Sequence, residues 1–205
     1  MREHSQSDEV YQRYLDRAIR QINQLGDDIA GCTLIEHPAH APVVGSGHPL
    51  ADIMLLKYRA QPSEVQEGVA FYGRAGDAIL KSIRRLDIDP LLVYGTNCVK
   101  CLDGHPDEAV RHCPIWLLRE LAIVEPKLVV VMGEGTVEVL NELEALPMRR
   151  DLDPLRLGEA QELTPTIQAI VVPDIDESLN DETAKRRFWT AFKRVGEWYE
   201  ALPPY

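Results

Sequence analysis

The sequence predicts an α/β fold, a three-layer αβα sandwich around a four-stranded parallel sheet, and three observations indicate it. Four short apolar runs have the composition of strands buried on both faces, at about 52–56, 91–94, 127–132 and 167–172. Segments with helical spacing of apolar residues alternate with these runs. No internal repeat or low-complexity linker separates two parts, so we expect a single domain over residues 1–205.

The elements are expected in a regular order along the chain. We predict an amino-terminal helix at about 8–26, a domain core at about 32–180 and a carboxy-terminal helix at about 181–202. Helices at about 75–87, 106–123 and 134–143 follow the first three strands. Residues 146–166 contain three prolines and are expected to be irregular, and residues 173–180 form an acidic loop.

Composition restricts the function classes. The chain has 33 acidic and 22 basic residues, which gives a net charge of −11. A nucleic-acid binder usually carries a basic footprint, so any such site here must be a local patch. No apolar run approaches the length of a membrane span, and the first residues contain no signal-peptide core. We therefore expect a cytoplasmic protein without a membrane partner.

Candidate site residues follow the strands, because the carboxyl ends of parallel strands face the ligand crevice. Phe71 lies in a glycine-rich stretch before a helix, and Asn97 follows the second strand. An aromatic face and an amide are suited to stacking on a planar base and reading its edge. The alternative is that Phe71 is a core residue and Asn97 forms a turn.

Four strings in order carry a family resemblance: ADIMLL, FYGRAG, VYGTNCVKC and CPIWLLRELAIVEPKLVVVMG. They resemble the family-four uracil-DNA glycosylases, the iron–sulfur branch of the uracil-DNA glycosylase superfamily. The resemblance implies that Phe71 stacks on uracil and that Asn97 reads the uracil edge. It also places Gly73, Arg74 and Gly76 on the segment that closes the base pocket and opens the following helix.

Departures from the family fall on its chemistry. Where the family has the string GEAPG, this chain has KYRAQ at residues 57–61, with long side chains in place of small glycines. Asp176 stands where the family has a late histidine that stabilises charge on the departing uracil. An ionised carboxylate there opposes the developing anion. Asp174, Asp176 and Glu177 also fall where the family passes DNA phosphates, and like charges oppose binding.

The cysteines give an incomplete metal set. Cys32, Cys101 and Cys113 match three of the four cysteines that bind the family's four-iron cluster, but Ile35 stands at the fourth position. We expect no cofactor. The alternative is an iron–sulfur cluster with a non-standard fourth ligand, such as His37. Cys98 is expected to be a small core residue that points opposite to Asn97.

Two classes of function remain open. The first is an enzyme, a divergent DNA glycosylase that removes uracil or another damaged base, in which Asp176 or Glu64 replaces the missing catalytic groups. The second is a protein with a partly retained nucleobase pocket that is weak or inactive in excision, or a module that binds another protein. Expected partners are DNA, a free nucleobase or nucleotide, or a basic protein. Lys57, Arg59 and Arg74 form a local basic cluster near the pocket mouth, which we interpret as solvated loop charge.

Overall fold

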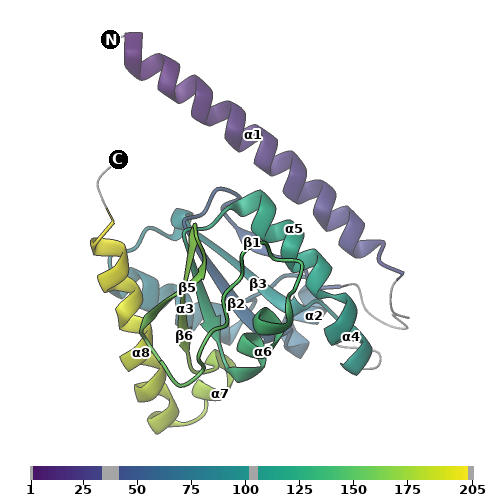
Figure 1. Ribbon diagram of the computed structural model, residues 1–205, viewed down its shortest axis with the longest axis vertical. Helices are drawn as coiled ribbons and strands as arrows, with labels where there is room; N and C mark the ends of the chain where they lie inside the picture. Colours follow the sequence, from purple (N-terminus) through teal and green to yellow (C-terminus); the bar gives the residue numbers. More distant parts are fainter. Residues whose placement is uncertain (1, 34–41, 102–105, 203–205) are drawn as a thin grey trace.

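The structure, a computed structural model, describes residues 2–33, 42–101 and 106–202 (Figure 1). Its helices and strands follow in this order: α1 (Arg2–Ala30), β1 (Ser46–Gly47), β2 (Ile53–Arg59), α2 (Pro62–Glu67), α3 (Arg74–Arg85), the 3₁₀ helix η1 (Pro90–Leu92), β3 (Val93–Val99), α4 (Pro106–His112), α5 (Pro114–Val124), β4 (Leu128–Met132), α6 (Glu134–Glu142), β5 (Ala160–Thr164), β6 (Ile167–Val172), α7 (Ile175–Ser178) and α8 (Glu182–Glu200).

The strands form one sheet in the order β1-β3-β2-β4-β6-β5. The four central strands run parallel, and β1 and β5 pair antiparallel at the two edges. The predicted α/β fold is therefore confirmed, with two edge strands added to the four expected. Strand β2 lies between β3 and β4, so the strand order reverses beside it. Open α/β sheets bind ligands outside the carboxyl ends of the strands at such a point.

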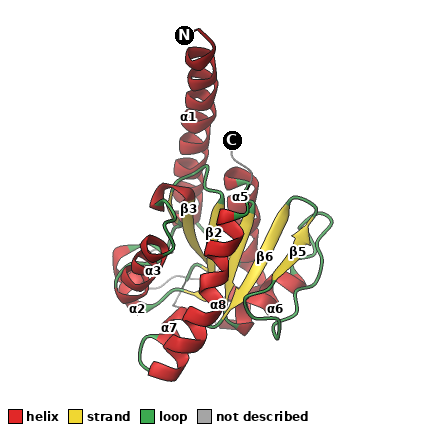
Figure 2. Ribbon diagram, turned by 90° about the vertical axis from the view of Figure 1, so that its left-hand side faces the viewer, coloured by secondary structure: helices red, strands yellow, loops and turns green. Residues whose placement is uncertain are grey.

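Helices cover both faces of the sheet (Figures 1 and 2). Alternate side chains of β2 point to opposite faces. Ile53 and Leu55 belong to the core formed with α3 and α8, whereas Met54 and Leu56 belong to the core formed with α5 and α6. Helix α1 packs its carboxyl half along α5, and its amino half extends beyond the rest of the molecule (Figure 1).

Several segments differ from the sequence predictions. The single helix expected at about 106–123 is divided into α4 and α5 at Cys113, because Pro114 begins α5 at a position where its missing N–H costs nothing. The segment 146–166 contains β5, and the acidic loop contains α7. Strand β2 continues beyond Leu56 to Arg59, because its backbone stays paired with β3.

No helix in the described ranges is long and apolar enough to cross a bilayer.

Candidate functional site

Phe71 and Asn97 lie on the same face of the sheet, where β2 and β3 end. The Phe71 ring packs directly over Gly95 of β3, since a Cβ built on Gly95 would stand 2.7 Å from Phe71 Cδ2. Asn97 comes two residues after Gly95 on the same strand, so its side chain points to the same face. Phe71 also contacts the core under α3 and α8. The two residues that the sequence singled out are therefore brought together.

Asn97 is fully buried, and neither Oδ1 nor Nδ2 has a hydrogen-bond partner among the described residues. A buried amide without partners is costly, so each such group in a folded protein needs an explanation. The side chain offers two donors and an acceptor side by side. The complement is a ligand edge that carries an acceptor next to a donor, as nucleobases do.

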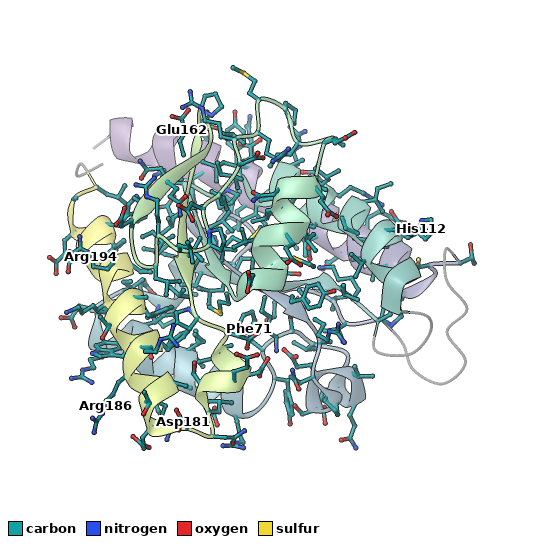
Figure 3. The ribbon with its side chains drawn as sticks, turned by 60° about the horizontal axis from the view of Figure 1, so that its bottom comes forward. Phe71, His112, Glu162, Asp181, Arg186 and Arg194 are labelled. Atoms are coloured by element: carbon teal, nitrogen blue, oxygen red, sulfur yellow. The ribbon has the colours of Figure 1, made fainter. Side chains whose placement is uncertain are left out.

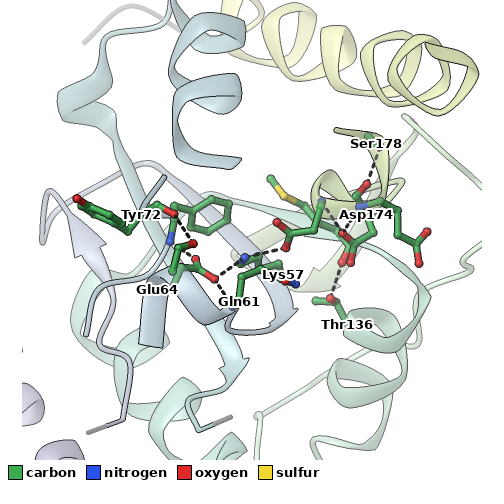
Figure 4. A network of polar contacts seen from close by, with 12 residues as sticks. Lys57, Gln61, Glu64, Tyr72, Thr136, Asp174 and Ser178 are labelled. Carbon is green, nitrogen blue, oxygen red and sulfur yellow. Dashed lines mark hydrogen bonds and ion pairs between the residues drawn. The ribbon is translucent and has the colours of Figure 1, made fainter. Parts of the chain in front are cut away.

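Lys57 is the main residue of the site that sequence reasoning missed. It lies beside Asn97 in the register of β2 and β3 and is buried. Its Nζ is 2.7 Å from Glu64 Oε2 and 2.8 Å from Asp176 Oδ2 (Figure 4). The interpretation of Lys57 as a solvated loop charge is wrong, because the strand continues through it and two carboxylates neutralise it. The triad Lys57–Glu64–Asp176 thus carries one positive and two negative charges.

The triad also touches the aromatic wall of the site. Lys57 Nζ lies over the Phe71 ring, 5.4 Å from its centroid. Glu64 accepts a hydrogen bond from the Phe71 backbone N–H and another, 2.6 Å long, from the backbone N–H of Gln61. Because every oxygen of Glu64 has a partner, a fully buried carboxylate is tolerated here.

The backbone of Phe71 has an unusual conformation, with φ of 60°. A non-glycine residue in this region is uncommon and needs support from its surroundings. The bond to Glu64 supplies part of that support. Gly76 supplies another part, since a Cβ there would collide with the Phe71 carbonyl oxygen. Glu64 and Gly76 therefore fix where the Phe71 ring stands.

Gly73 and Arg74 begin helix α3. Gly73 has φ of 87°, which favours glycine, and precedes the first helical residue. Arg74 donates from Nη2 to the Leu179 carbonyl oxygen at 3.3 Å and to Asn180 Oδ1 at 3.1 Å. Arg74 thereby ties the start of α3 to the connection between α7 and α8. Arg59, the third member of the expected basic cluster, is exposed and lies over the Tyr58 ring.

The three acidic residues after β6 have different surroundings. Asp174 caps α7 by accepting from the backbone N–H groups of Asp176 and Glu177, and burial raises the pKa of its carboxyl group. Asp176 turns inward to Lys57, and its side chain is 19% exposed. Glu177 is exposed. Of these three carboxylates, only Glu177 is exposed on the surface.

A second buried ion pair lies on the opposite face of the sheet. Lys100 Nζ is 2.6 Å from Glu120 Oε2, and Glu120 also accepts from Tyr94 and Thr96. Burial, followed by the charge of Glu120, raises the pKa of Tyr94. Every polar atom of this group has a partner, so it is a structural connection between β3 and α5.

Cys101 and Cys113 are in contact beyond the end of β3. The Cys101 thiol donates to Cys113, and this bond lowers the pKa of Cys113 to about 7. The same contact and burial raise the pKa of Cys101, and the charge of Cys32 acts on it as well. Cys98 is buried in the core on the α5 face, away from Asn97, and burial raises its pKa to about 12.

The sequence predicts Cys32, Cys101 and Cys113 as candidate metal ligands. Within 2–33, 42–101 and 106–202, no group of three or more Cys, His, Asp or Glu side chains is arranged to hold a metal ion. Ile35 and His37, the two positions that bear on a fourth ligand, lie outside the described residues. Absence of a cofactor and the alternative iron–sulfur cluster both stay predictions. The visible absorption spectrum of anaerobically purified protein distinguishes them.

Comparisons with known proteins all point to uracil-DNA glycosylases. Residues 44–194 match the family model of the uracil DNA glycosylase superfamily. A type-4 uracil-DNA glycosylase of Pyrobaculum aerophilum is 26% identical over 129 residues, which cover 61% of this chain and 65% of that protein, slightly less than two thirds of its length. One of Archaeoglobus fulgidus is 24% identical over 163 residues, 76% of this chain and 80% of that protein.

Proposed function

The chain belongs to the uracil-DNA glycosylase superfamily, and from that membership we propose that it binds a nucleobase between Phe71 and Asn97 but is weak or inactive in uracil excision. The observation that carries the proposal is the buried amide of Asn97, which has no partner among the described residues. It stands next to an aromatic ring whose backbone is held in place by Glu64 and Gly76. A base supplies the hydrogen-bonding edge that Asn97 lacks, and Phe71 offers that base an aromatic ring to stack on.

The position of Lys57 favours bases that carry carbonyl groups. A base that stacks on Phe71 meets the Lys57 ammonium group as well as the Asn97 amide. A carbonyl oxygen accepts from the first, and an adjacent N–H and carbonyl pair with the second. Uracil and other bases with carbonyl groups fit this requirement. A strand of DNA is the expected carrier, because both relatives are named uracil-DNA glycosylases.

The position of Lys57 between two carboxylates also supports a low rate of uracil excision. Cleavage of the glycosidic bond leaves a base anion, and a cation near the base favours it. Lys57 puts an ammonium group in the site, but Glu64 and Asp176 both lie within 2.8 Å of it. Because negative charge is in excess in this triad, it offers little stabilisation to a developing anion.

An active divergent glycosylase is the second candidate. The observation that favours it is the partly exposed carboxylate of Asp176, which contacts Lys57 next to Phe71 and could position a water molecule or steady a cation-like sugar. In that case Asp176 acts as a catalytic residue, with Glu64 as the other candidate. The two proposals predict opposite effects of removing the Asp176 charge.

Base binding is tested with an oligonucleotide that carries 2′-fluoro-deoxyuridine, which resists cleavage. Asn97→Ala and Phe71→Ala should each weaken binding, and for Phe71 a lost stacking contact of about 1–3 kcal/mol corresponds to roughly 5- to 150-fold in Kd. Fluorescence anisotropy measures the Kd. Tyr72→Ala is the matched control, because this neighbouring aromatic side chain is 50% exposed. Equal affinities for all four proteins would overturn the pocket assignment.

A further inference from the structure

The outer face of α8 carries a basic patch, although the chain as a whole has a net charge of −11. Side chains at helical spacing line a groove of about 550 Å³ between α8 and the turn at residues 157–159. The groove is lined by four cations, Arg186, Arg187, Lys193 and Arg194, and by one carboxylate, Glu159. In Figure 3, Arg186 and Arg194 project from α8 on the side away from Phe71.

The cations of this α8 groove are only partly neutralised. Arg194 pairs with Glu197, and Glu182 lies near Arg186. Glu159 is itself paired with Arg156, 2.8 Å away. No ion pair is found for Arg187 or Lys193 within the described part of the chain. Positive charge therefore remains along the groove.

The shape of the groove suits an extended anion rather than a single ion. Arg186 and Lys193 are separated by seven residues of helix, which is about 11 Å at 1.5 Å per residue. Because neighbouring phosphates of a strand follow one another within a few ångströms, this row is long enough to contact more than one of them. Thr183 and Thr190 line the same groove and add hydroxyl donors.

We infer that the α8 groove binds the phosphate backbone of a nucleic acid, as a second contact surface separate from the base pocket. This inference rests on the proposed function for its ligand, a DNA strand, whose other phosphates are free to contact a surface away from Phe71. The apolar side of α8, with Phe188 and Phe192, is buried against the sheet, so the helix presents its cations from a fixed platform. The contact is independent of sequence and sensitive to salt.

The test uses an oligonucleotide of tetrahydrofuran abasic residues, which has a phosphate backbone and no bases. The variant Arg186→Glu/Arg187→Glu/Lys193→Glu is compared with wild-type protein by fluorescence anisotropy over a range of salt concentrations. We expect at least a tenfold loss of affinity at low salt. We also expect the slope of log K against log salt to shrink by about 2, since each single-strand phosphate contact contributes about 0.7.

The matched control is Arg13→Glu/Arg17→Glu/Arg20→Glu on α1, which changes the net charge by the same amount at another exposed basic surface. Equal losses in the two triple variants, or no loss in the α8 variant, would overturn the inference. If the charge reversals disturb folding, the milder variant Arg187→Gln/Lys193→Gln takes their place. It removes two cations and should lower the slope by about 1.4. Because the strand of this test carries no base, it measures the groove alone, whereas the 2′-fluoro-deoxyuridine oligonucleotide measures the base pocket. Failure of the groove and failure of the pocket therefore give different results.

Discussion

Replacing Lys57 with methionine is expected to lower the free energy of unfolding by about 3–5 kcal/mol, the usual cost of removing one partner from a buried ion pair. Lys57 and Glu64 are both buried, and Lys57 Nζ lies 2.7 Å from the Glu64 carboxylate. Methionine fills a similar space but leaves Glu64 as an uncompensated buried charge. Urea denaturation at neutral pH measures the loss.

Two further variants identify the cause. Lys57→Met/Glu64→Gln should recover part of the lost stability, because the only charge of the triad then left without its partner is Asp176, whose side chain is 19% exposed. Lys185→Met is the control, since its ion pair with Glu182 is exposed and should contribute less than about 1 kcal/mol. If Lys57→Met costs no more than Lys185→Met, the triad does not stabilise the site.

Asp176→Asn is expected to increase uracil excision. The substitution removes one of the two carboxylates that neutralise Lys57, so the remaining pair with Glu64 no longer carries excess negative charge. One unit charge at about 6 Å with an effective dielectric constant of 20 is worth roughly 3 kcal/mol. The rate on a deoxyuridine oligonucleotide should therefore rise on the order of 100-fold under single-turnover conditions.

Glu177→Gln provides the matched control for this experiment. Glu177 is the neighbouring carboxylate, it is exposed, and its side chain makes no ion pair among the described residues. It should leave the excision rate unchanged. If Asp176→Asn instead abolishes an excision activity that the wild-type protein has, Asp176 is a catalytic group and the active-glycosylase candidate is correct.

Local sequence was sufficient for the fold and for part of the site. The apolar run of β4, LVVVM, is typical of a strand buried on both faces. Gly76 lies where the backbone of Phe71 approaches closely. Phe71 and Asn97 are recognisable because the sequence predicts each of them after a strand and because their strings resemble a known family. The strand predicted at about 91–94 in fact continues as β3 to Val99, so Asn97 lies inside it and forms no turn. The proximity of Phe71 and Asn97 follows from parallel strands ending at one edge of the sheet.

The burial of Lys57 could not be predicted in this way. A lysine after an apolar run is normally read as the end of a strand, since an isolated buried charge is costly. Its two partners lie 7 and 119 residues further along the chain, so only the tertiary structure reveals them. The sequence makes Glu64 a catalytic candidate, but only the tertiary structure shows that it accepts a hydrogen bond from the Phe71 backbone N–H. The irregular segment that contains β5 was missed because its pattern alternates over only five residues.

The two proposed contact surfaces bind different parts of a DNA strand. The pocket between Phe71 and Asn97 would take one base, and the α8 groove would hold phosphates that carry no sequence information. Binding of a DNA strand should weaken at high salt, because its phosphates release counterions when they contact the cations of the α8 groove. Binding of a free base should be insensitive to salt.

The most direct test of the account is the NMR signal of the Asn97 side-chain amide during a titration of ¹⁵N-labelled protein with free uracil. Comparison with the spectrum of Asn97→Ala assigns the signal. We predict that the Asn97 Nδ2 resonances shift saturably with uracil, that Tyr72→Ala leaves this shift unchanged, and that Phe71→Ala weakens the binding. An Asn97 signal that stays unchanged up to saturating uracil would contradict a nucleobase pocket at this site.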